Sequence, residues 1–150
     1  QDIRAGTFTL GAADLLDDDS LVHVNGATLA LENFSDTVAG VTLSSGTISG
    51  TGGGVLGSLS DFQVKSGTVS AKLAGPVRLS KTTTGTVTLS NSGNTYTGAT
   101  TISGGTLTIG ADGCLGTQRG LCRAEPGRHQ RAGKTGSRSA SALRYSSVGM

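Results

Sequence analysis

The chain offers few residues for nucleophilic catalysis. A serine or cysteine nucleophile needs a base within reach, commonly a histidine that a carboxylate orients. His23 is the only histidine among residues 1–113, and it stands between Val22 and Val24 in a segment that alternates apolar and polar residues. Because alternation points both valines inward, it points His23 outward. We therefore expect a solvated imidazole at His23 rather than a catalytic base, and we assign no catalytic residue.

Residues that could bind a metal are also sparse. Acidic residues cluster at Asp14, Asp17, Asp18 and Asp19, and carboxylate oxygens are ligands that calcium prefers. The cluster lacks the glycine spacing of a calcium-binding loop, so we interpret it as a solvated acidic turn. We expect no metal and no cofactor.

Small residues dominate the composition. The 150 residues include 25 glycines, 21 threonines and 18 serines, whereas aromatic residues are 3% and charged residues 15% of the chain. Both of these fractions are low for a globular enzyme of this length. An ordinary compact core is therefore not expected, and the elements that would position a site must be sought in a repeat.

A short unit recurs through the first part of the chain: glycine, threonine, an apolar residue, then threonine or serine, with one residue inserted in the second copy. The copies begin at Gly6, Gly26, Gly46, Gly67, Gly85 and Gly105, which are separated by 20, 20, 21, 18 and 20 residues. Alternation of apolar and polar residues within the unit is the period of a strand with one buried face. Each period therefore predicts two or three short strands joined by turns.

Stacking of successive units would bury the apolar face that one unit cannot bury alone. We predict an all-β fold, a right-handed parallel β-helix (solenoid) of about six ~20-residue coils over residues 1–113, roughly 25 to 30 Å long. The glycines are expected at coil corners, where φ is positive. The predicted inward column consists of Phe8, Leu29, Ile48, Val69, Val87 and Leu107.

The outward neighbours of this column are mostly hydroxyl residues. They are Thr7/Thr9, Thr28/Ala30, Thr47/Ser49, Thr68/Ser70, Thr86/Thr88 and Thr106/Thr108. Stacked coils would align them in two ladders. Such arrays resemble ice-binding surfaces, but threonine is also a favourable outward residue on any exposed sheet. The serine and alanine replacements and the uneven coil lengths favour the second interpretation.

One segment resembles a known family. Residues 79–107, LSKTTTGTVTLSNSGNTYTGATTISGGTL, are similar to the passenger-associated strand repeat of bacterial autotransporters. The residues that carry the resemblance are Lys81, Gly85, Asn94, Thr95, Tyr96, Thr97, Gly98, Thr100 and Gly105. The pattern departs at Thr83, where glycine is usual, and the resemblance extends roughly over residues 6–116. It implies a secreted β-helical stalk, carried to the surface of a Gram-negative cell by a C-terminal β-barrel translocator outside this sequence.

The composition changes near residue 113. Residues 1–113 hold five basic and nine acidic residues, a net charge of −4, whereas residues 114–150 hold seven basic residues and one acidic residue, a net charge of +6. We therefore divide the chain into a repeat region, 1–113, and a basic tail, 114–150. We expect the tail to be disordered or non-native, as after a shifted reading frame. Its Cys114 and Cys122 could form a disulfide in an oxidising compartment and make a poor zinc site.

The repeat and the resemblance together favour a non-enzymatic structural or adhesive segment of a secreted or surface-displayed passenger. We expect a monomer, host cell-surface or matrix molecules as ligands, and no nucleic-acid partner. Two other classes stay open. A β-helical carbohydrate-active enzyme would show a carboxylate cluster in a surface cleft, and an ice-binding solenoid would show regular hydroxyl ladders.

Overall fold

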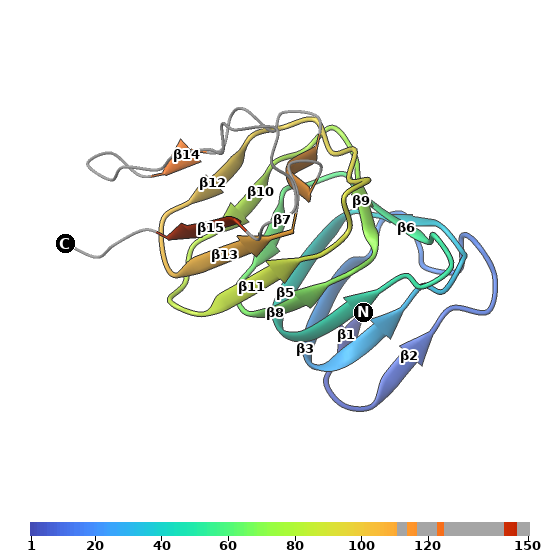
Figure 1. Ribbon diagram of the computed structural model, residues 1–150. Helices are drawn as coiled ribbons and strands as arrows, with labels where there is room; N and C mark the ends of the chain where they lie inside the picture. Colours follow the sequence, from blue (N-terminus) through green and yellow to red (C-terminus); the bar gives the residue numbers. More distant parts are fainter. Residues whose placement is uncertain (111–113, 117–122, 125–142, 147–150) are drawn as a thin grey trace.

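Segments that alternate apolar and polar residues form short strands, as their period of two predicts. The computed structural model (Figure 1) describes residues 1–110, 114–116, 123–124 and 143–146. Within residues 1–110 the paired strands are parallel, and they pair with strands of the adjacent coils. The chain therefore winds as a parallel β-solenoid, and the predicted fold class is confirmed.

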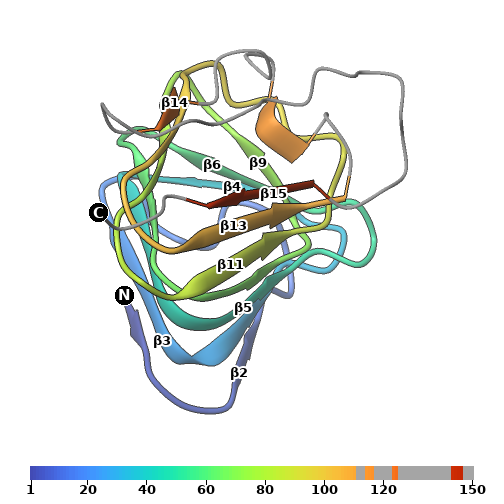
Figure 2. The ribbon, with the colours of Figure 1, turned by 60° about the vertical axis from the view of Figure 1, so that its left-hand side comes forward.

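Three stacks of strands form the sides of the solenoid (Figure 2). The first side contains β1 (Asp2–Ile3), the first halves of β3 (Leu21–Ala30) and β5 (Gly40–Ser49), β7 (Phe62–Val64), β10 (Leu79–Lys81), β12 (Thr100–Ile102) and β14 (Arg123–Ala124). The second side contains β2 (Thr7–Thr9), the second halves of β3 and β5, β8 (Gly67–Val69), β11 (Thr86–Leu89) and β13 (Thr106–Ile109), followed by the antiparallel β15 (Leu143–Ser146). The third side contains β4 (Asp36–Val38), β6 (Val55–Ser58) and β9 (Lys72–Ala74). The six parallel rungs of the second side are joined by five turns, close to the six predicted coils.

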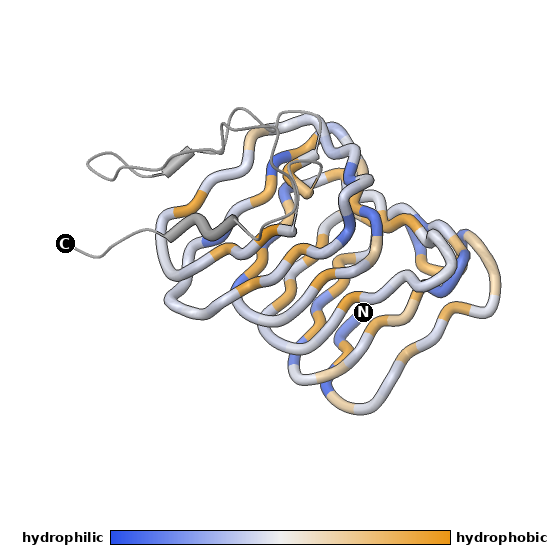
Figure 3. The backbone as a smooth tube through the Cα atoms, in the orientation of Figure 1, coloured by the Kyte–Doolittle hydropathy of each residue, from blue (hydrophilic) through white to orange (hydrophobic). Residues whose placement is uncertain are grey.

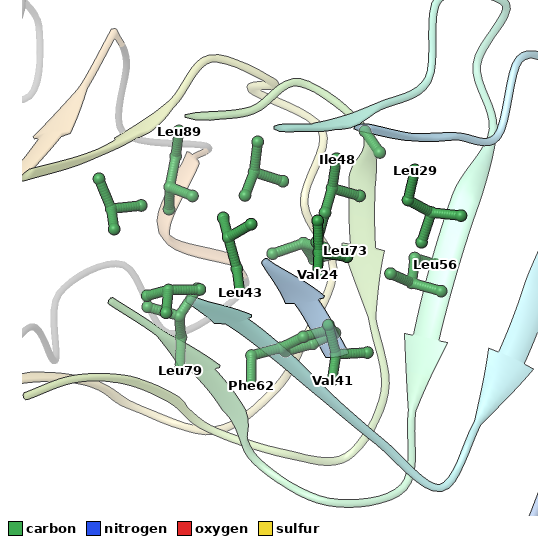
Figure 4. Packing of buried hydrophobic residues seen from close by; sticks show 14 of the residues in the cluster. Val24, Leu29, Val41, Leu43, Ile48, Leu56, Phe62, Leu73, Leu79 and Leu89 are labelled. Carbon is green, nitrogen blue, oxygen red and sulfur yellow. The ribbon is translucent and has the colours of Figure 1, made fainter. Parts of the chain in front are cut away.

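The interior is a column of aliphatic side chains. Hydrophobic residues recur along every coil of residues 1–110 (Figure 3), because one residue in two points inward. Side chains from all three sides meet there, among them Leu29, Leu43 and Leu73 (Figure 4), and each of these is no more than 1% exposed.

The register of the column differs from the prediction at one step. Phe8, Leu29, Ile48 and Val69 lie opposite one another as expected, but the next partner of Val69 is Leu89. Val87 lies opposite Gly67 instead. The cause is the short spacing of 18 residues between Gly67 and Gly85. Paired residues of β8 and β11 are 20 positions apart in the chain, so the pairing is offset by two residues from an alignment of the two glycines. A shift of two preserves which face each side chain occupies, so Val87 and Leu107 are still fully buried.

Glycine at the corner between the first and second sides is required by the close approach of the coils. Gly46 has φ +105°, and a Cβ there would lie far inside van der Waals contact with the carbonyl oxygen of Ala27. Gly67 has φ +119°, and a Cβ there would lie far inside van der Waals contact with the carbonyl oxygen of Gly46. Gly85 does not have a positive φ, which agrees with the shifted register of its unit.

The third side closes differently in successive coils. Residues 90–99, which follow β11, contain no strand, although the equivalent stretches of earlier coils form β4, β6 and β9. The buried Asn94 takes part in this closure: its Oδ1 accepts a hydrogen bond from Leu73 N at 2.9 Å, and its Nδ2 donates to Cys114 O at 2.8 Å. One side chain thus joins three consecutive coils.

The basic tail is described only in part. Residues 114–116 form a short 3₁₀ turn, while β14 and β15 pair with β12 and β13. The expected disorder falls mainly on residues outside the described ones, and so does Cys122 of the proposed disulfide. Cys114 is a buried free thiol. Within the described residues, no helix is long and apolar enough to cross a membrane.

Candidate functional site

The outer face of the second side carries one continuous column of threonines. The backbone pairing places Thr7, Thr28, Thr47, Thr68, Thr88 and Thr108 in line, and we call this column the threonine ladder. The neighbouring column begins Thr9, Ala30, Ser49. Thr86 and Thr106 pair with each other outside the ladder. The two predicted hydroxyl ladders therefore change register at β11, where Thr68 pairs with Thr88 instead of Thr86.

His23 points outward from the first side, as alternation predicts, but its imidazole has protein partners. Its Nε2 lies 2.7 Å from Ser44 Oγ, within hydrogen-bond distance, and its Nδ1 lies 3.6 Å from Asp2 Oδ1. The side chains of His23 and Asp2 are each 40% exposed. The imidazole is therefore partly exposed to solvent and also contacts two protein groups, which the sequence did not predict. A sequence reading could not find this constellation, because its three members come from three different coils.

A bulge between β3 and β5 positions Ser44. Val24 pairs with Leu43 and Asn25 pairs with Ser45, so Ser44 is an extra residue without a partner in β3. A bulge of this kind bends the strand and re-aims a side chain. Ser44 therefore reaches the imidazole of His23, although the backbone partner of His23 in β5 is Thr42.

Asp2 is held by a second partner. Arg4 Nε donates to Asp2 Oδ2 at 2.6 Å, and this hydrogen bond lowers the pKa of Asp2 below its ordinary value of 3.8. The carboxylate is therefore ionised at neutral pH, and its other oxygen faces His23. An ionised carboxylate beside an imidazole favours the tautomer that carries its proton on Nδ1 and leaves Nε2 as an acceptor.

A groove of about 470 Å³ lies beside this constellation on the outer face of the first side. Gly40 lines it together with Leu21 and Ser60, and a Cβ at Gly40 would come within 3.0 Å of Leu21 Cδ2. The residues that line it also include His23, Lys65 and, as its single carboxylate among the described residues, Asp61. Asp61 Oδ1 accepts a hydrogen bond from Arg78 N at 2.9 Å.

The acidic turn is anchored by a residue that the sequence interpretation missed. Asp36 is 2% exposed, and its Oδ2 accepts hydrogen bonds at 2.8 Å from the backbone nitrogens of Leu15 and Leu16. Asp36 thereby fastens the loop that carries the four clustered aspartates. In the part of the chain that the structure describes, no three His, Cys, Asp or Glu side chains come together as metal ligands.

Lys81 is the most unusual residue of the interior. It lies between Val64 and Ile102 on the inward face of the first side and is fully buried. Its Nζ donates to the carbonyl oxygen of Thr83 and, at 3.2 Å, to that of Gly104. Burial lowers the pKa of Lys81 below its ordinary value of 10.5. The alternation Leu79, Ser80, Lys81 is the sequence signal that places this lysine inside.

Comparison with known families gives one match. Residues 79–109 match the family model described as the passenger-associated-transport-repeat. The matched segment contains Lys81, Asn94 and Tyr96, so the residues that close the interior are also residues of the repeat pattern. No curated protein matches the chain, and no solved structure matches it.

The match confirms the resemblance seen in the sequence. The similarity to the passenger-associated-transport-repeat covers residues 79–109.

Proposed function

We propose that the chain is a rod segment of an autotransporter passenger, displayed on or secreted from a Gram-negative cell. The observation that supports this proposal is the continuity of the solenoid. The matched repeat, residues 79–109, pairs through β10 and β11 with β7 and β8 of the upstream coils. The repeat and the coils before it therefore share one interior.

The mechanism of such a segment is length and rigidity. Each coil adds about 4.8 Å to a stack of parallel strands, and backbone hydrogen bonds and the aliphatic column hold successive coils together. This role is non-enzymatic and suits a monomer, because the solenoid buries its apolar residues within one chain. Such a segment would hold the modules that it carries at a distance from the cell surface.

Adhesion is the finer part of the proposal. The threonine ladder presents hydroxyl groups along the rod on the second side, and host cell-surface or matrix molecules are the ligands that we propose for the outer faces. Binding of the purified chain to immobilised matrix proteins and to host cells tests this part. Binding no stronger than that of an unrelated protein of the same charge would contradict adhesion and leave the rod proposal intact.

Surface display is tested on the cells that make the full-length protein. Antibodies raised against residues 1–110 should label intact cells or the culture fluid. An antibody against a periplasmic protein, which labels only permeabilised cells, is the control. Labelling that requires permeabilisation would contradict the proposal.

A further inference from the structure

Ser44, His23 and Asp2 stand in the order of the groups that activate a serine hydroxyl, with a hydrogen-bond distance between the first two and a longer contact between the last two. In that arrangement a histidine accepts the serine proton and a carboxylate orients the histidine. Here Ser44 Oγ lies 2.7 Å from His23 Nε2, and His23 Nδ1 lies 3.6 Å from Asp2 Oδ1. The histidine is thus placed between a hydroxyl and a carboxylate, with a different ring nitrogen toward each.

The backbone fixes all three members. Asp2 stands directly opposite His23 in the pairing of β1 with β3, and the bulge in β5 supplies Ser44. Ser66 Oγ donates to Ser44 O at 2.9 Å, which holds the backbone of the bulge from the next coil. A site on paired strands is positioned more accurately than a site on a free loop.

A substrate could reach the serine from the adjacent groove. His23 and Lys65 both line the groove. Val64 pairs with Leu43, and Lys65 N donates to Leu43 O at 2.8 Å. The backbone of Lys65 therefore lies beside that of Ser44, and a cation on the same face would favour the negative charge that develops on an attacked carbonyl oxygen.

We propose that Ser44 is an activated nucleophile that takes the acyl group of a small carboxylic ester, with His23 as its base and Asp2 as the residue that orients the base. Ser44 Oγ forms a bond to the carbonyl carbon, and the hydroxyl proton passes to His23 Nε2. The bond from the carbonyl carbon to the alcohol oxygen then breaks, and the leaving alkoxide takes the proton from His23 Nε2. The products are acyl-Ser44 and a free alcohol. This self-acylation is independent of the rod role, so either proposal can fail without the other.

The test uses the full chain and p-nitrophenyl acetate. The expected result is a burst of p-nitrophenolate of one equivalent per chain and a gain of one acetyl group, which peptide mapping by mass spectrometry locates on Ser44. Ser44→Ala should abolish the burst, because it removes the nucleophile, and His23→Gln should slow it by about 100-fold or more. Ser45→Ala and His129→Gln are the matched controls and should react like the unchanged chain.

A cysteine variant separates loss of reactivity from loss of fold. In Ser44→Cys, the imidazole should favour the thiolate and speed alkylation by iodoacetamide at pH 7 at least tenfold over Ser45→Cys. Circular dichroism reports whether each variant keeps its strands. Acetylation confined to lysines and the N-terminus, an undiminished burst in His23→Gln, or equal alkylation of the two folded cysteine variants would overturn the proposal.

Discussion

The coils of residues 21–74 and the matched repeat of residues 79–109 bury the same kind of column but differ in how its third side is closed. In the upstream coils, parallel strands β4, β6 and β9 form that side through backbone pairing. In the matched repeat the backbone also bonds to the preceding coil, Thr95 N to Leu73 O at 2.8 Å and Thr97 N to Gly75 O at 3.0 Å, and the buried side chains of Asn94 and Tyr96 add their own hydrogen bonds. Asn94 links Leu73 to Cys114, and Tyr96 Oη lies 2.7 Å from Thr100 Oγ1.

The difference explains why a family pattern is recognisable in one region. Backbone pairing accepts many side chains, so the sequence of the upstream third side is weakly constrained. A buried amide or phenol that pairs with particular polar groups cannot be exchanged without leaving those groups unpaired. Family motifs should therefore be clearest where side chains close the interior, which is where residues 79–109 match.

The largest expected effect tests what the two regions share. Val87 is fully buried, and Val87→Asp would place an unpaired carboxylate in the common column. We expect the free energy of unfolding to fall by about 3–5 kcal/mol, enough to unfold a marginally stable solenoid. Urea denaturation followed by circular dichroism measures it. Thr88→Asp, on the outer face, should leave the transition within about 0.5 kcal/mol, and equal losses in the two variants would contradict the inward assignment of Val87.

The next effect tests the closure of the matched repeat. Asn94→Ala would leave Leu73 N and Cys114 O without their side-chain partners, at a cost of about 2–3 kcal/mol in the free energy of unfolding. Thr37→Val, on β4 of the upstream third side, should cost less than about 0.5 kcal/mol, because backbone pairing persists there. Thr95→Ala is the exposed control beside Asn94. Equal urea midpoints for Asn94→Ala and Thr37→Val would remove the distinction between the two regions.

Tyr96 gives a smaller effect within the same closure. Its ring packs edge-on against Phe62, with centroids 6.2 Å apart, and Tyr96→Phe keeps this contact while removing the hydrogen bond to Thr100. We expect a loss of about 1 kcal/mol in the free energy of unfolding. A double-mutant cycle with Thr100→Val isolates the bond. A coupling energy of zero would show that the two hydroxyls do not stabilise the coil through each other.

The smallest effect concerns Lys81, the buried lysine of the matched repeat. Because burial lowers the pKa of Lys81 below 10.5, the unfolded chain binds the proton more tightly than the folded chain. The free energy of unfolding should therefore rise with pH between the folded-state pKa and 10.5, then level off. Lys81→Met should abolish this rise in urea titrations at a series of alkaline pH values. The same rise in Lys81→Met would assign it to another group.

Periodicity was sufficient to predict the fold class and the inward residues, but not the register. Alternation fixes only which face a residue occupies, so Val87 and Leu89 were equally good partners for Val69 until the backbone pairing chose Leu89. The constellation of Ser44, His23 and Asp2 was out of reach for a related reason. It depends on a bulge between β3 and β5, and no local pattern in the sequence marks that bulge. The burial of Lys81, in contrast, follows from the alternation that starts at Leu79.

The central claim is that the matched repeat and the upstream coils form one rod, joined where β8 pairs with β11. Disulfide trapping tests this junction in a chain that also carries Cys114→Ala and Cys122→Ser. Thr68→Cys with Thr88→Cys should form a disulfide readily, because these positions face each other on adjacent strands, at a spacing that a disulfide can bridge. Thr68→Cys with Thr86→Cys should not, because diagonal neighbours are about 7–8 Å apart. Preferential trapping of the second pair, or of neither, would contradict the account.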